Sequence, residues 1–76
     1  MHISEIVEKG AIIFLDKETD ILIAWDGHID FRVYAGKFDG DYDLLDEFYK
    51  EIKTMPAARE VARMWFHDHS VYNPGP

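Results

Sequence analysis

The sequence contains no cysteine, only three prolines, and eight lysines and arginines against fifteen aspartates and glutamates. Without cysteine the chain forms no disulfide and offers no thiolate to a metal. Its 76 residues limit it to one domain, residues 1–76, and so short a domain buries a smaller share of its surface than a large one. The chain is 47% hydrophobic and has eleven aromatic residues. Its stability must therefore come from dense aromatic packing or from a partner subunit.

The scarcity of basic residues excludes whole classes of ligand. The formal net charge is −7 and the pI is about 4.8, whereas direct binding to nucleic acid or to an anionic membrane requires cations. No apolar run approaches the roughly 20 residues that cross a bilayer. Residues 1–5 lack the basic start and apolar core of a signal peptide. We expect no direct nucleic acid contact, no membrane contact, and a cytoplasmic location, in a cell or in a virus-infected host cell.

The arrangement of residues needed for nucleophilic catalysis is also missing from the sequence. The only serines, Ser4 and Ser70, lie near the two ends of the chain. A catalytic triad needs a nucleophile, a base and an orienting acid held together by a scaffold. The four histidines do not supply that arrangement; they are His2, His28, His67 and His69. The sequence predicts a protein that is not an enzyme and uses no cofactor.

Two segments resemble metal sites and fail on spacing. In a helix the side chains of His67 and His69 point about 200° apart, so they do not chelate one ion. The segment 39–43 (DGDYD) resembles the start of a calcium loop, which needs glycine at its sixth position and glutamate at its twelfth. Leu44 and Lys50 occupy those positions. We predict no metal site.

Three segments have strand patterns. Residues 12–15 and 21–25 are short apolar runs, and residues 29–35 alternate apolar and polar side chains, as in a strand with one buried face. They predict a three-stranded antiparallel meander. Before it, Ser4 and Gly10 suit the cap and the end of a short helical turn over residues 3–9, although a short strand fits the same residues.

The length of the loop after Trp25 decides the faces of this sheet. A two-residue loop, Asp26-Gly27, leaves two apolar faces, the second of which needs a cover or another copy of the chain. That copy would form a homodimer through Ile21, Ile23 and Trp25 with Tyr34. A three-residue loop, Asp26–His28, produces a single apolar face, and we favour it because a short chain can cover one face by itself. That face would combine Ile21, Ile23 and Trp25 with Ile29, Phe31 and Val33.

The second half of the chain predicts two helices. Residues 43–53 show helical spacing at Leu45, Phe48, Tyr49 and Ile52, and a strand over residues 42–52 is the alternative. Thr54 is then a helix cap with Pro56 in the first turn. The apolar stripe of this second helix, which ends near residues 67–69 before a tail at 70–76, comprises Ala58, Val61, Ala62 and Trp65. The predicted fold is α+β, a three-stranded meander packed against two C-terminal helices in the order β-β-β-α-α.

Acidic residues concentrate between positions 39 and 51, as Asp39, Asp41, Asp43, Asp46, Glu47 and Glu51. On the predicted helix, Asp43, Glu47 and Glu51 would stand one above another about 6 Å apart. A row with that spacing, close to the spacing of backbone phosphates, would fit a basic groove made for nucleic acid. A solvated helix face that keeps the chain soluble is the plainer interpretation.

In size and charge the chain resembles the small acidic proteins with which phages block host defence enzymes, anti-CRISPR proteins among them. The resemblance implies a non-enzymatic inhibitor that imitates nucleic acid and docks its negative face on a basic, nucleic-acid-binding surface of a partner protein. The six clustered carboxylates are the predicted partner-binding residues. The alternative is a structural or regulatory interaction module that acts as a homodimer.

Overall fold

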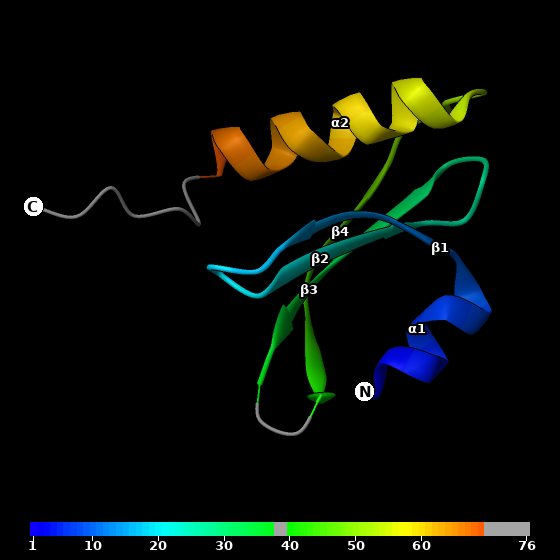
Figure 1. The fold of residues 1–76 in the computed structure, drawn as a ribbon. Coiled ribbons are helices and arrows are strands. Elements are labelled where there is room, and N and C mark those ends of the chain that lie inside the picture. Colours follow the sequence, from blue (N-terminus) through cyan, green and yellow to red (C-terminus); the bar gives the residue numbers. More distant parts are fainter. Residues whose placement is uncertain (38–39, 70–76) are drawn as a thin grey trace, which may run out of the picture.

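The computed structural model describes residues 1–37 and 40–69. Its elements follow one another in the order α1 (Ile3–Lys9), β1 (Ala11–Asp16), β2 (Ile21–Trp25), β3 (Asp30–Gly36), β4 (Tyr42–Tyr49) and α2 (Met55–Asp68) (Figure 1). The predicted α+β class is confirmed. The predicted order β-β-β-α-α is wrong, because the sheet has four strands and one of the two helices precedes it. The predicted tail, 70–76, lies outside the described residues.

The segment predicted as a helix over 43–53 is strand β4, which pairs antiparallel with β3. The strand alternative over 42–52 is therefore confirmed in type and nearly in extent. In β4, Phe48 lies opposite Phe31, and their rings stack in parallel with centroids 4.9 Å apart. A β-bulge places Leu45 as an extra residue between the partners of Val33 and Tyr34. The bulge interrupts the two-residue alternation of β4, and Ile52, the last residue of the predicted helical stripe, lies beyond the end of the strand.

The four strands form one antiparallel sheet in the order β1-β2-β3-β4, so β1 and β4 are its edges. At the β2–β3 hairpin the first opposed pair is Trp25 and Phe31, not the Trp25–Ile29 pair of a three-residue loop. The loop is longer because Asp26 Oδ1 accepts hydrogen bonds from the N–H groups of residues 28–30. The loop is longer by an even number of residues, so the same side chains face the same side of the sheet as predicted, and Ile23 lies opposite Val33. The residues predicted to share a face therefore do so, apart from Ile29, which lies in the loop; they are Ile21, Ile23, Trp25, Phe31 and Val33.

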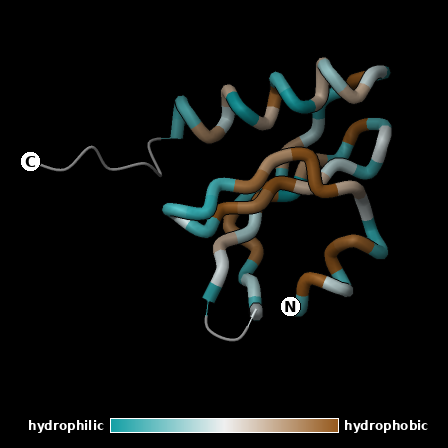
Figure 2. Tube along the Cα trace, viewed as in Figure 1, coloured by the Kyte–Doolittle hydropathy of each residue, from teal (hydrophilic) through white to brown (hydrophobic). Residues whose placement is uncertain are grey.

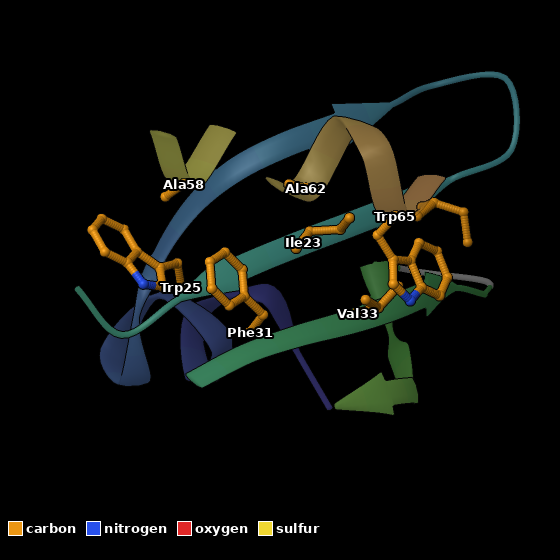
Figure 3. Close-up of a cluster of buried hydrophobic side chains, with 8 residues drawn as sticks. Ile23, Trp25, Phe31, Val33, Ala58, Ala62 and Trp65 are labelled. Atoms are coloured by element: carbon orange, nitrogen blue, oxygen red, sulfur yellow. The ribbon is translucent and has the colours of Figure 1, made fainter. Parts of the chain in front are cut away.

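Helix α2 covers this face. Thr54 caps it as predicted, accepting the N–H of Ala57, and proline follows in the first turn. Ala58 and Ala62 are fully buried against the sheet, and Trp65 is 8% exposed (Figure 3). The core on this side consists of Ile21, Ile23, Trp25, Phe31, Val33, Ala58, Ala62 and Trp65. The small alanines let the helix approach the aromatic layer closely, so the predicted stripe is confirmed.

Helix α1 covers the opposite face of the sheet. His2, rather than the predicted Ser4, is its N-cap and accepts the Ser4 N–H through Nδ1 at 3.1 Å. Ile6 is fully buried and forms a second cluster with Leu22, Ala24 and Tyr34. The favoured prediction of a single apolar face is therefore wrong: the sheet has two apolar faces, because Leu22, Ala24 and Tyr34 are also buried, and the chain covers both faces itself.

This arrangement corrects the predicted dimer surface. Ile21, Ile23 and Trp25 lie under α2, and Tyr34 is 1% exposed under α1. These side chains are already buried within one chain, so a dimer would need a different surface.

Hydropathy follows the same layers. Apolar residues concentrate along the central strands, whereas the β1–β2 turn and much of α2 are polar (Figure 2). In the described ranges 1–37 and 40–69, neither helix has the length and apolar character needed to cross a membrane.

Candidate functional site

The predicted acidic row does not exist in the form expected. Residues four apart in a regular strand share a face, but the bulge at Leu45 reverses the alternation within β4. Asp43 lies opposite Ala35 on the α2 face, whereas Glu47 lies opposite Arg32 on the α1 face. Glu51 follows the end of the strand, and Asp39 lies outside the described residues. The helical stripe of three carboxylates is therefore wrong, and the cluster divides between two faces.

Three of the clustered carboxylates have cationic partners within the chain. The N-terminal ammonium lies 2.6 Å from Asp41, Lys37 Nζ lies 3.0 Å from Asp43, and Arg32 Nε lies 3.1 Å from Glu47. The hydrogen bond from the ammonium group lowers the pKa of Asp41. The charge that these three carboxylates present to a partner is partly compensated.

Asp46 has a different environment. Its Oδ2 accepts a hydrogen bond from Trp65 Nε1 at 2.8 Å, and its Oδ1 accepts the Glu47 N–H at 2.9 Å. The His69 ring stacks on the indole of Trp65 at 4.3 Å. Among the described residues no salt bridge involves Asp46 or Glu51. Asp46 therefore joins β4 to α2, and within the described residues its carboxyl group is in no salt bridge.

A second carboxylate cluster, missed from the sequence, lies on the α1 face. Arg32 Nε bonds both Asp30 Oδ2 at 2.9 Å and Glu47 Oε2 at 3.1 Å. Burial raises the pKa of Asp30, and the neighbouring Glu47 carboxylate raises it further. Hydrogen bonds from Asp30 and from Arg32 lower the pKa of Glu47. Asp30 is the member of the pair that holds a proton more readily. One sequence feature pointed to this cluster: the alternation of apolar and polar residues over 29–35 places Asp30 and Arg32 on the same face of the strand.

The space beside this cluster is too small for a substrate. A cavity of about 10 Å³ adjoins Asp30, Arg32 and Tyr34, enough for about one water molecule. In the same region Asp30 Oδ1 is buried and has no hydrogen-bond partner within the part of the chain that the structure describes. The geometry suits a structural ion-pair network more than acid–base chemistry.

A groove runs between α2 and β4. One part, of about 280 Å³, is lined by Phe48, Lys50, Val61, Met64, Trp65 and Asp68. A neighbouring part is lined by Leu45, Asp46, Trp65 and His69. Met64 and Leu45 are 51% and 50% exposed. The groove is therefore an accessible apolar surface with carboxylates at its rim.

The outer edge of β4 is less open than its position in the sheet suggests. The Tyr42 N–H donates to the Met1 carbonyl at 2.7 Å, and the N-terminal ammonium donates to the Tyr42 carbonyl at 2.8 Å. The Glu47 N–H is taken by Asp46. Together with the bulge, these bonds occupy groups that an added strand would need. Contacts on this flank are therefore left mainly to side chains.

Metal ligands do not gather in the described ranges, where no group of three or more histidine, aspartate or glutamate side chains is placed to hold an ion. His67 Nδ1 lies 3.8 Å from Asp68, and both side chains are largely exposed. In the segment that resembles a calcium loop, Asp39 lies outside the described residues, and Tyr42 and Asp43 belong to strand β4.

A scan against models of known protein families, a search of curated proteins and a search of solved structures each found no match to this chain. Functional inference therefore rests on the geometry of the chain itself.

Proposed function

We propose that this protein is a small, acidic, non-enzymatic binding protein that docks on a basic surface of a partner protein. The observation that carries the proposal is the flank formed by β4 and α2. There the carboxylate of Asp46 and the half-exposed Leu45 line one part of the groove, and the half-exposed Met64 lines the neighbouring part. Apolar contact supplies affinity and complementary charge supplies orientation and association rate.

The partner-binding surface in this proposal includes the described members of the acidic cluster, and the net charge of −7 attracts a basic partner at long range. A surface that otherwise binds nucleic acid is the natural basic target, as in the phage inhibitors that the chain resembles in size and charge. The proposal does not include a helical row of carboxylates that imitates phosphates, because residues 42–49 form a strand. The absence of cysteine suits a reducing cytoplasm as the setting.

Charge neutralisation at two sites tests the proposal. Asp43→Asn with Glu51→Gln removes two exposed carboxylates from the β4 flank. Glu8→Gln with Glu18→Gln removes two exposed carboxylates that flank β1, at the opposite edge of the sheet. Both double variants change the net charge equally, so any difference between them reports location.

Each protein is used to capture partners from a lysate of its native host at about 0.1 M and about 1 M salt, where the Debye length falls from about 10 Å to about 3 Å. The expected result is a basic protein retained by the wild type and the β1-flank variant at low salt. It should be lost at high salt and with the β4-flank variant. Equal retention by both double variants would refute the proposed surface.

A second candidate, a homodimeric interaction module, is favoured by one feature of the other edge strand. The first five residues of β1, Ala11–Leu15, carry no charge, and Leu15 is 49% exposed. An uncharged edge strand is open to pairing with a second copy. Sedimentation should then give about twice the 8.9 kDa chain mass, and Leu15→Lys should return the monomer mass. A wild-type monomer at micromolar concentration rejects this candidate.

A further inference from the structure

The groove between α2 and β4 has an apolar floor made by both elements. Met64 and Trp65 contribute from the helix, and Leu45 and Phe48 contribute from the strand. Trp65 is almost fully buried and its indole is fixed by the bond to Asp46. An aromatic ring that is held in place offers a rigid wall to an incoming side chain, which lowers the entropy lost on binding.

Two carboxylates stand at the rim of this floor. Asp46 lines the part next to Leu45, and Asp68 lines the part next to Met64. Within the described residues, Asp46 has no salt bridge, and the nearest basic group to Asp68 is His67 Nδ1 at 3.8 Å. Lys50 is the only lysine or arginine among the described residues that line these two parts. The rim therefore favours a ligand with positive charge on both sides of an apolar group.

A second copy of the chain fits the groove poorly. Each copy has a net charge of −7, and a symmetric contact would bring two Asp46 and two Asp68 carboxylates together. Like charges that meet at an interface oppose association. An added strand is also disfavoured, because Asp46 itself caps the Glu47 N–H.

We propose that this groove binds one bulky apolar side chain of a partner protein, flanked in that partner by lysine or arginine residues that approach Asp46 and Asp68. The inference rests on the proposed function and specifies what the basic partner must present. The apolar side chain inserts between Met64 and Leu45 and contacts the indole of Trp65. The flanking cations balance the two rim carboxylates.

The test uses five-residue peptides and the indole N–H resonance of Trp65 in nitrogen-15 NMR spectra. In one set a central leucine, phenylalanine or tryptophan is flanked by lysines; in a second set the same residue is flanked by glutamates; in a third, lysines flank alanine. The Trp65 resonance is assigned by its loss in Trp65→Phe. We expect a saturable shift of this resonance with the first set, and binding at least about tenfold weaker with the other two, a difference of about 1.4 kcal/mol.

Matched variants localise the binding. Met64→Glu places a charge on the groove, and Val7→Glu places the same charge on α1 at a side chain of similar exposure, 51% against 52%. Met64→Glu should abolish the saturable shift, while Val7→Glu should leave it within about twofold. Both substitutions are at exposed positions where folding is little affected, and the dispersion of the spectra checks this directly.

Several results would overturn the inference. They are no shift with the lysine-flanked peptides, equal shifts with the glutamate-flanked peptides, or equal effects of the two variants. A Trp65 shift that depends on protein concentration without peptide would assign the groove to a second copy. If a captured partner is lost with Asp43→Asn and Glu51→Gln but kept with Met64→Glu, the groove is wrong and the proposed function stands.

Discussion

Trp65 Nε1 donates a hydrogen bond to Asp46 Oδ2 at 2.8 Å, joining α2 to the edge strand β4 across nineteen positions of sequence. The indole is 8% exposed, so its N–H has little access to water. The pair is at once a structural link and a wall of the proposed groove.

Asp46→Ala should destabilise the fold by about 1–3 kcal/mol, because it leaves the Trp65 N–H buried without an acceptor. Asp46→Asn keeps an oxygen that can accept this bond and should cost clearly less. Urea denaturation followed by tryptophan fluorescence measures both free energies of unfolding. Equal losses in the two variants would show that the hydrogen bond is not what matters at this position.

Gly10→Ala should destabilise the protein by about 1–3 kcal/mol, the usual cost of forcing extra atoms into a packed site. A Cβ at Gly10 would lie 2.7 Å from the Trp25 carbonyl oxygen, a backbone atom that cannot move aside alone. Ala11→Ser adds one atom at the neighbouring exposed position and should change stability by less than about 0.5 kcal/mol. Thermal unfolding of the two variants side by side measures this difference.

Ile6→Ala should cost about 2–5 kcal/mol, and Ile6→Val about 0.5–1.5 kcal/mol. Ile6 is fully buried against Leu22 and Tyr34, and it is the buried contact through which α1 covers the second face of the sheet. The free energy of unfolding of a small domain is only about 5–15 kcal/mol, so the alanine variant should lose a large part of its stability. Chemical denaturation checks the graded order, and a loss below about 1 kcal/mol for Ile6→Ala would contradict the docking of α1.

The pH dependence of stability should identify Asp30. Burial and then the neighbouring Glu47 raise the pKa of Asp30 above its ordinary value of 3.8. A raised carboxyl pKa means that the folded state holds the proton more tightly, so this contribution is complete below pH 3.8 and is lost as the pH rises through the raised value.

Asp30→Asn removes that contribution. The stability of the variant minus that of the wild type should therefore increase with pH across this window. Urea unfolding at a series of pH values measures the difference. A difference that falls with rising pH would mean that the folded state favours the ionised form of Asp30.

The parts of the fold that depend on local signals could be predicted. Thr54 and Pro56 mark the start of α2 through backbone groups within one helical turn, and the buried stripe from Ala58 to Trp65 follows from helical spacing. The side chains that β2 and β3 share on one face were predicted correctly from the two-residue period of a strand. The length of the loop between the two strands was not.

The parts that depend on distant contacts could not. Whether residues 42–49 form a helix or a strand is decided by pairing with β3, and the bulge at Leu45 hides the alternation that marks a strand. The partners of Asp41 and Asp46 are Met1 and Trp65, both far away in sequence. Counting the charges in a segment of sequence therefore does not show which carboxylates form salt bridges or hydrogen bonds in the folded chain.

The bulge in β4 also marks the position at which this strand can lose a residue without losing its pairing. Val33 lies opposite Asp46 and Tyr34 opposite Leu44, so Leu45 is one residue more than the ladder needs. Deleting it would keep every opposed pair, whereas a single deletion nearer to the β4–α2 connection would turn the following side chains to the wrong face. Natural variants of this strand that are one residue shorter should therefore have lost their residue at position 44 or 45.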